Sequence, residues 1–450
     1  MGARGGRHFV VAIALYILAA TVRLWCIGSF ITFDEVHWAA NGAHFLHGLI
    51  TGNWLETVQF AAPGVFTMWA AALPAFIKVF VLGRGREAWD LVSAYPVTVL
   101  PLDEPLLRAA AFFLPESRVV LALLNALRTP VVYLLLIRLG LTPVTAFLGA
   151  ALAALDPFVV GHDRVLHTDG PAATFFLPAL LALLVGLESS SPKGRWVFVS
   201  GSLAMAALLS KSTGGLVIPT LFVLLLLHAG RPPHARVRTV KAVTSWMAGA
   251  IAAAFVFWPA LWGGPIRAVR AVLDLSLHFA GTPHPTNYFL GKAYVEEAPG
   301  PLFYLVSLPT RTTPLIWLGI LLALPYLTAK TREGRLSRAI WLAIVLFLVP
   351  VSLSAKEFER YLLPLYPPLA VLAALGWTRL ATATARFVPR RWSDLLLGLI
   401  VALQGGAAIA EFPYYFTYLP TRTPCSAASL RPCTGCPPAG ERGSNRWRRS

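Results

Sequence analysis

Short polar segments that interrupt apolar runs hold the residues of this chain that could do chemistry. The first segment follows the opening apolar run and reads FDEVHW over residues 33–38. Two adjacent carboxylates beside apolar and aromatic neighbours can have their pKa values pushed apart, so that one of them acts as a base. Asp34 and Glu35 are therefore candidate catalytic residues. An exposed acid pair that caps the next helix is the structural alternative.

A second segment reads GHDRVLHTDGP over residues 161–171. Asp169 lies just before the proline that opens the next apolar run, so it is either a functional carboxylate or a helix N-cap. Asp163 and Arg164 are neighbours of opposite charge, and we expect them to pair with one another.

Two cations stand beside apolar runs. Lys211 lies within the apolar hairpin of residues 196–229, where an ionisable side chain is costly unless it has a partner. Arg360 lies in KEFERY, residues 356–361, and is placed to meet an anion at the level of the lipid head groups. The alternatives are a snorkelling lysine and an arginine that only anchors the chain to lipid. Acids and cations at one membrane face suit the transfer of a group from a lipid phosphate.

A long loop over residues 263–312 contains His284 and Tyr288. Aromatic and glycine residues in such a loop suit stacking against a sugar, but an ordinary packed loop is an equal alternative. His162, His167 and His284 have acids nearby, yet their spacing matches no dependable metal-ligand pattern. We therefore predict no metal site from these residues. A divalent cation bound by other groups is kept as a possible cofactor.

The composition indicates which elements must position these groups. Hydrophobic residues make up 56% of the chain, charged residues only 13%, and the mean hydropathy is +0.65. A soluble domain is typically about a quarter charged, so most of this surface faces something other than water. The net charge of +17 comes from basic residues in short links between apolar runs. This arrangement is typical of cytoplasmic loops facing anionic lipids, and it argues against nucleic-acid binding.

About eleven apolar runs are long enough to cross a bilayer. They cover residues 9–27, 118–137, 143–160, 171–187, 196–210, 214–229, 242–262, 313–328, 338–353, 361–377 and 393–410. The predicted fold class is an all-α polytopic membrane protein. A cytoplasmic N-terminus, with the first run retained as a helix, places the arginine-bearing links inside. The polar segments and the long loops 28–117 and 263–312 then lie outside.

Two further stretches need a separate interpretation. Residues 63–82 are apolar enough to cross, but one extra crossing would turn every later basic link outward, so we expect an interfacial helix in the first outer loop. Residues 421–450 are rich in Arg, Pro, Gly, Ser and Cys and have no periodicity. This composition predicts a disordered basic tail or sequence from a shifted reading frame. Residues 1–420 are predicted to form one transmembrane domain.

An ordered set of motifs carries a resemblance to a known family. The motifs are ITFDEVHWAANG, AAPGVFTMW, LDPFVVGHDRVLHTDGPAATFF, LLSKSTGGLVIP, PTNYFLGKA and KEFERYLLPLYPPLAVLAALG. The set resembles the membrane glycosyltransferases of the protein O-mannosyltransferase and aminoarabinose-transferase type, which belong to the GT-C superfamily. The resemblance covers roughly residues 9–420 and implies polyprenyl-phosphate sugars as donors, with inversion at the anomeric carbon.

The resemblance also implies roles for single residues. Asp34 would be the catalytic base with Glu35 beside it, and Asp169 would match a second outer-loop carboxylate. Lys211 and Arg360 would bind the donor phosphate. We expect four further side chains to contact the substrate, those of His167, His284, Tyr288 and Tyr361.

The chain departs from the family pattern at two places. Relatives commonly carry a histidine before the Pro-Gly pair that begins at Pro63, and this chain has Ala62 there. Relatives also continue beyond a Pro-Tyr-Tyr stretch such as residues 413–415 into an Asn-Pro and Gly-Gly segment, whereas this chain enters its basic tail.

The expected function is transfer of a glycosyl group from a polyprenyl-phosphate sugar to an acceptor hydroxyl. The expected location is the outer face of the plasma (inner) membrane, and the acceptor would be a protein, lipid or glycan. The alternative is a polytopic transporter or lipid flippase. A transporter would need charged residues near the bilayer midplane in paired broken helices, and the charges here cluster at one predicted face.

Overall fold

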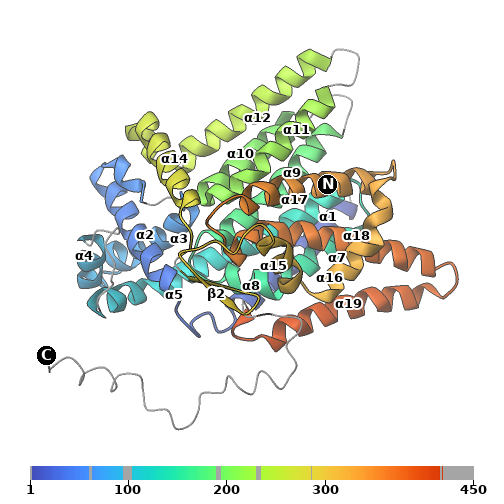
Figure 1. Cartoon of the computed structure of the whole chain (residues 1–450), viewed down its shortest axis with the longest axis horizontal. Helices are drawn as coiled ribbons and strands as arrows, with labels where there is room; N and C mark the ends of the chain where they lie inside the picture. The colour runs from blue at the N-terminus through green and yellow to red at the C-terminus, as the bar shows by residue number, and fades with distance from the viewer. Residues whose placement is uncertain are drawn as a thin grey trace, which may run out of the picture.

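The computed structural model describes residues 3–59, 63–94, 104–188, 194–229, 235–284, 286–415 and 418. These residues form a helical protein with one small β-hairpin, as Figure 1 shows. The predicted all-α membrane fold class is thereby confirmed. The predicted tail over residues 421–450 lies outside the described residues, as does Ala62 of the segment that departs from the family pattern.

Among the described residues, seven helices are long and apolar enough to span a bilayer. They are α1 (Ala3–Leu24), α5 with α6 (Glu104–Ala126 and Arg128–Arg138), α9 (Asp169–Leu187), α12 (Ala235–Phe257), α17 (Arg332–Ser352), η5 with α18 (Glu359–Leu365 and Tyr366–Thr384) and α19 (Arg390–Ala410).

Two bent helix pairs bring the number of candidate spans among the described residues to nine. The first pair is α7 (Pro143–Ala154) with α8 (Pro157–Asp163), and the second is α15 (Phe303–Arg311) with α16 and η4 (Pro314–Ala323 and Leu324–Leu327). The remaining predicted spans fall on shorter apolar helices, α10 (Gly194–Ser210) and η3 with α11 (Ser212–Leu216 and Val217–Ala229). The total of about eleven spans stays a prediction.

Two predicted spans depart clearly from the helices of the structure. The helix predicted over 118–137 begins at Glu104, and the 35 residues to Arg138 rise about 52 Å, which is longer than a bilayer core. The run over 143–160 bends by 61°. Asp156 causes this break by capping α8, since its Oδ1 accepts a hydrogen bond from the backbone N–H of Val159 (3.0 Å) and Pro157 follows it.

Burial separates central helices from peripheral ones. The candidate spans in α9 and in η5–α18 are 83% and 89% buried, whereas those in α12 and α19 are 22% and 28% buried. The exposed side chains of α12 include Ile251, Phe255 and Val256. Such continuous apolar surface is unfavourable in water and is typical of lipid-facing helices. The chain is a multi-pass membrane protein.

The first long loop folds into helices of its own. They are α2 (Phe33–Thr51), η1 (Trp54–Thr57), α3 with η2 (Val65–Phe76 and Ile77–Val81) and α4 (Arg86–Ala94). With the first half of α5 they share an apolar core that includes Trp38, Phe45 and Trp89. Most side chains at the start of α3 are buried in this core, whereas Val81 and Leu82 are exposed. The predicted interfacial helix over 63–82 is therefore packed along its first half, and its place at the membrane surface stays a prediction.

The second long loop begins with α13 and α14 (Ala260–Gly263 and Pro265–Gly281) and continues into the hairpin of β1 (Thr286–Phe289) and β2 (Lys292–Val295). The turn residues Leu290 and Gly291 have φ of 50° and 80°, the left-handed values that a two-residue hairpin turn requires. The side chain of Asn287 donates to the backbone oxygen of Glu357 (3.1 Å). This contact fixes the hairpin to the segment that leads into η5.

Candidate active site

Four side chains from four separate segments meet in one cluster of two acids and two cations. Asp34 lies at the start of α2 and Asp169 at the start of α9, Lys211 joins α10 to η3, and Arg360 lies at the start of η5. Arg360 donates through Nη1 to Asp34 Oδ2, and its Nε lies 3.6 Å from Asp169 Oδ2. Lys211 Nζ lies 2.5 Å from Asp169 Oδ1. We call these four residues the acid–cation cluster.

Asp169 is the most buried member of the acid–cation cluster. It is 2% exposed, and the N-cap of α9 is Thr168 rather than Asp169. A carboxylate in the first turn of a helix is stabilised by the helix dipole. Gly170 permits close packing here, because a Cβ at this position would lie 2.5 Å from the side-chain Nδ2 of Asn125 in α5. The carboxylate of Asp169 is therefore held between two cations at the end of a tightly packed helix.

Asp34 is the acid of the cluster that is open to solvent. Its side chain is 36% exposed, compared with 2% for that of Asp169. Burial raises the pKa of Asp34, but the charge of Arg360 and the hydrogen bond from it outweigh this effect, so the pKa lies below its usual value. Asp34 is consequently ionised at neutral pH and can accept a proton from a group that enters from solvent.

Lys211 lies where the helical backbone is interrupted. Its own backbone is extended (φ −159°, ψ 144°), and η3 begins at the next residue. The side chain is 10% exposed and its Nζ lies 3.9 Å from the centre of the Tyr361 ring. Burial lowers the pKa of Lys211 to about 8, although the charge of Asp169 opposes this shift. The ammonium group contacts an acid and an aromatic face, so the snorkelling alternative does not describe this lysine.

His167 lies next to the cluster as a neutral ring. The backbone N–H of Asp169 donates to His167 Nδ1 (3.0 Å), which places the ring proton on Nε2. Burial lowers the pKa of His167 to about 3, although the charge of Asp169 opposes this shift. Among the described residues, His167 Nε2 is buried and has no hydrogen-bond partner. It is an N–H donor that a bound molecule could use.

Glu35 does not share the surroundings of its neighbour Asp34, which favours a structural role for it over that of a second catalytic acid. It is fully buried, and its Oε2 accepts a hydrogen bond from the backbone N–H of Thr32 (2.8 Å). Its Oε1 accepts from Arg118 Nε (2.6 Å) and from the backbone N–H of Leu166 (2.9 Å). Both carboxylate oxygens are thus occupied. Glu35 ties the start of α2 to α5 and to the segment before Asp169.

Asp163 and Arg164 do not pair with one another, so that expectation is wrong. Asp163 is fully buried and lies 2.6 Å from Arg23 Nη2 and 2.5 Å from Arg128 Nη2. Arg164 donates to the backbone oxygens of residues 25 and 26. These contacts join α1, α6 and α8. A buried acid near a helix bend is also what a transporter would use, but these three charges are closely paired, which favours a structural role.

The predicted substrate-lining residues fall into two groups. Tyr361 faces Lys211. The rings of His284 and Phe358 contact each other at a tilt of 34°, with ring centres 4.7 Å apart, next to the segment that holds Arg360. Tyr288 lies on β1 and is 74% exposed, and the described contacts do not bring it to the cluster. His284 and Tyr361 are therefore placed near the cluster, whereas Tyr288 lies on the surface of the hairpin.

Among the described residues, no three His, Cys, Asp or Glu side chains are grouped in a way that could hold a metal ion. The acid–cation cluster and the adjacent His167 offer one solvent-accessible carboxylate, two cations and one neutral N–H donor. This set is suited to binding a phosphate and removing a proton from a hydroxyl.

The sequence reasoning missed three arginines that hold this site together, Arg23, Arg118 and Arg128. All three are buried, with exposed fractions of 0–3%. Each one lies within an apolar run, where an isolated charge is costly. That cost was the available signal that each needed a buried acid as its partner.

The chain was compared with known families and structures. Residues 116–262, which contain Asp169 and Lys211, match the family model described as dolichyl-phosphate-mannose-protein mannosyltransferase. The structure is similar to that of ArnT from Cupriavidus metallidurans bound to undecaprenyl phosphate, with a TM-score of 0.51 and 15% identity. This match covers 91% of this chain and 65% of ArnT, so the chain spans 65% of the length of that relative.

Two further structures match with lower scores. One is ArnT from the same organism in the apo state, with a TM-score of 0.49 and 14% identity over 91% of this chain and 65% of that one. The other is the S. cerevisiae protein O-mannosyltransferase Pmt1-Pmt2 complex bound to the sugar donor, with a TM-score of 0.41 and 16% identity over 58% of this chain and 34% of that one. No curated protein sequence matches the chain significantly. The family model over residues 116–262 and the structural similarity to ArnT agree with the resemblance seen in the motifs, and the chain has the fold of ArnT.

Proposed function

We propose that this chain transfers a glycosyl group from a polyprenyl-phosphate sugar to an acceptor hydroxyl, with inversion at the anomeric carbon. The observation that carries the proposal is the acid–cation cluster itself. Two cations, one solvent-accessible carboxylate and one buried carboxylate are brought together from four segments by direct contacts. The family model and the ArnT fold support a polyprenyl-linked donor. The description of the family model names dolichyl-phosphate-mannose, and the matched ArnT structure contains bound undecaprenyl phosphate.

Lys211 and Arg360 would bind the donor phosphate. In the structure their charges are balanced by Asp169 and Asp34. A phosphate that enters the cluster supplies new negative charge, so Arg360 can exchange its contact with Asp34 for the phosphate oxygens. Guanidinium groups bind phosphate through two parallel hydrogen bonds, and a lysine adds a point charge. Binding of the donor would thus release the Asp34 carboxylate for chemistry.

Asp34 would then act as the base. Its carboxylate takes the proton of the acceptor hydroxyl while the hydroxyl oxygen forms a bond to the anomeric carbon. The bond from that carbon to the phosphate oxygen breaks, and Lys211 and Arg360 stabilise the departing phosphate. Attack from the face opposite the leaving group inverts the anomeric centre, as in inverting hydrolases. Asp169 remains paired with Lys211 and keeps it oriented.

The proposed location of this reaction is the outer face of the plasma (inner) membrane. The support is the distribution of basic residues, since Arg138 ends α6 and Arg332 begins α17, far along the helices from the cluster. The positive-inside rule assigns those ends to the cytoplasm and the cluster to the other side. The donor would enter sideways from the outer leaflet, and the acceptor would be a protein, a lipid or a glycan.

The test is a transfer assay on membranes that contain the chain, with a panel of polyprenyl-phosphate sugars. The wild type should transfer one of these sugars, and Asp34→Asn should abolish transfer while inserting normally. Asp90→Asn is the matched control, because Asp90 is an exposed acid of the same loop that pairs with Arg86 four residues away. Full activity of Asp34→Asn would refute the assignment of the base. Absence of transfer with every donor, together with lipid or solute transport, would refute the transferase proposal.

A further inference from the structure

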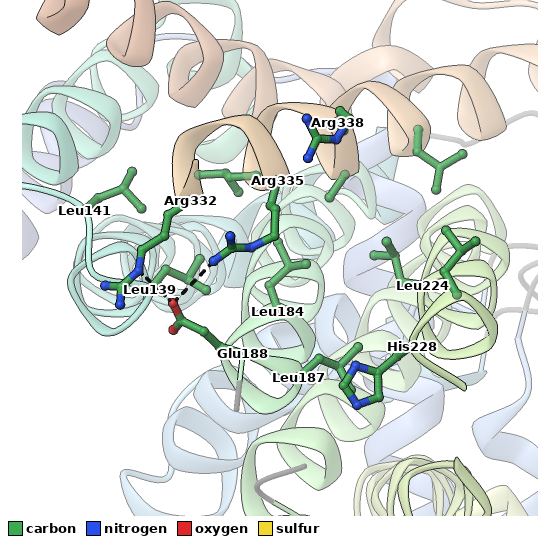
Figure 2. A pocket seen from close by; sticks show the side chains of 14 residues that line it. Leu139, Leu141, Leu184, Leu187, Glu188, Leu224, His228, Arg332, Arg335 and Arg338 are labelled. Carbon is green, nitrogen blue, oxygen red and sulfur yellow. Dashed lines mark ion pairs between the residues drawn. The ribbon is translucent and has the colours of Figure 1, made fainter. Parts of the chain in front are cut away.

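A hollow lies at the opposite end of α9 from the acid–cation cluster. It is a cavity of 590 Å³ lined by the ends of α9 and α11, the start of α17 and the turn after α6 (Figure 2). The 19 residues of α9 rise about 28 Å from Asp169 to Leu187, which is close to the thickness of a bilayer core. The cavity therefore lies near the membrane boundary opposite to the cluster.

One wall of the cavity is apolar. Its leucines come from three separate parts of the chain and are Leu139, Leu141, Leu184, Leu187, Leu224 and Leu227. Leu227 is 64% exposed, so part of this wall is open to the surroundings of the bundle. An apolar wall at this depth offers a surface along which a hydrocarbon chain can pack.

The other wall carries three arginines. Arg332, Arg335 and Arg338 are spaced three residues apart, so they lie on neighbouring parts of one face of α17. Figure 2 shows Arg332 and Arg335 reaching toward Glu188, whose Oε1 lies 3.2 Å from Arg332 Nε and 3.8 Å from Arg335 Nη2. Glu188 is the one acid among the described residues that line the cavity, and two guanidinium groups share its carboxylate. Arg338 instead donates through Nη1 to the backbone oxygens of residues 327 (3.0 Å) and 329 (2.8 Å).

The dipole of α17 does not stabilise arginines at the start of the helix. Cations in the first turns of a helix are disfavoured by the helix dipole. The side chains of Arg332 and Arg335 are 56% and 47% exposed, so they remain accessible to a ligand. The excess of positive charge beside an apolar wall matches a molecule that has an anionic head and a hydrocarbon tail.

We propose that this cavity binds an anionic glycerophospholipid from the leaflet opposite to the acid–cation cluster. Its phosphate group contacts Arg332 and Arg335, and an acyl chain packs along Leu184, Leu187 and Leu224. A zwitterionic lipid is disfavoured because its cationic head group meets the arginines. A free phosphate ion would leave the leucine wall unused. The proposal does not depend on glycosyl transfer, because the cavity lies at the other end of the bundle.

The test measures thermal unfolding of the purified full chain in detergent with added phosphatidylglycerol, phosphatidylcholine or inorganic phosphate. The wild type should be stabilised by phosphatidylglycerol and not by the other two. The double variant Arg332→Ala/Arg335→Ala should lose about tenfold or more in apparent affinity for phosphatidylglycerol. The matched control is Arg390→Ala/Arg391→Ala, which removes two arginines from the start of α19 and should bind as the wild type does.

A second variant tests the apolar wall while the arginines stay intact. Leu224→Trp fills space beside the leucines and should weaken the stabilisation by phosphatidylglycerol. If the double variant does not fold, Leu224→Trp alone tests whether phosphatidylglycerol binds in the cavity. Equal stabilisation of the wild type and of a folded variant would overturn the proposal. Equal stabilisation of the wild type by inorganic phosphate would also overturn it, because the cavity would then be a site for free anions.

Discussion

Asp34 and Asp169 contact the same guanidinium group. Arg360 donates to Asp34 Oδ2 through Nη1, and its Nε lies 3.6 Å from Asp169 Oδ2, although the two acids belong to different helices that are far apart in the chain. The acids differ in exposure, since Asp34 is open to solvent and Asp169 is buried against Lys211. This difference is the basis for assigning the two acids different roles.

Asp169 should be required for folding as well as for activity. Replacement by Asn leaves the buried ammonium of Lys211 without its charged partner, and removal of one member of a buried ion pair costs about 3 kcal/mol. Asp169→Asn should therefore lower the thermal unfolding temperature and also abolish transfer. Wild-type stability in this variant would show that the Lys211–Asp169 contact does not support the fold.

Lys211 should contribute charge to donor binding in a pH-dependent way. Its pKa of about 8 means that it is protonated below pH 8 and loses its charge above it. The kcat/KM for the donor should fall as the pH rises through about 8. Lys211→Arg, which stays charged, should move that decline to higher pH, and Lys211→Gln should raise the KM for the donor about tenfold or more at every pH. A decline at the same pH in Lys211→Arg would assign it to another group.

Between pH 5 and pH 7, kcat/KM should not depend on pH. The pKa of Asp34 lies below its usual value because Arg360 outweighs the effect of burial, and burial keeps the pKa of His167 at about 3. Neither group changes its charge between pH 5 and pH 7, so kcat/KM should be constant over this interval. A decline centred near pH 6.5 that disappears in His167→Asn would contradict the neutral state assigned to this histidine.

Glu35 should prove to be a positioning residue. Glu35→Gln removes the charge that binds Arg118 and should destabilise the chain by about 3 kcal/mol, measured as a lower unfolding temperature. The folded fraction should retain measurable transfer with an unchanged pH profile, in contrast to Asp34→Asn. Complete loss of transfer in a stably folded Glu35→Gln protein would restore this acid to the catalytic group.

Tyr361 and Tyr288 allow a comparison of two predicted substrate-lining tyrosines. The Tyr361 ring faces Lys211 Nζ at 3.9 Å, whereas Tyr288 is 74% exposed on the hairpin. Tyr361→Ala should reduce transfer, and Tyr361→Phe should retain most of it because the ring is kept. Tyr288→Ala should transfer at the wild-type rate. A large loss in Tyr288→Ala would mean that the hairpin contacts the substrate.

The apolar spans and the polar residues between them could be predicted from the sequence because both depend on local patterns. Long apolar runs identified the helices, and charges beside those runs identified Asp34, Asp169, Lys211 and Arg360. A charge at the edge of an apolar run needs a partner wherever that partner lies in the chain. These candidate site residues could therefore be chosen from the sequence without knowing which side chains contact one another.

The partners themselves could not be predicted, because they depend on how the helices pack. Asp163 pairs with Arg23 and Arg128 from other helices rather than with its neighbour Arg164. Glu35 points into the protein toward Arg118, although it follows Asp34 directly. Adjacent residues on a helix point in directions about 100° apart, so neighbours in sequence do not share surroundings.

The most direct test of the central claim is whether residues 34 and 360 lie together at one membrane face. Asp34→Cys and Arg360→Cys are combined in a chain whose four cysteines have been replaced by serine, and a short, membrane-impermeant bismaleimide is added to oriented membranes. The proposed site predicts efficient cross-linking of this pair from one side only. The control pair of Asp34→Cys with Glu188→Cys, at the far end of α9, should not be linked. Failure of the first pair to cross-link, or equal linking of both pairs, would contradict the proposed site.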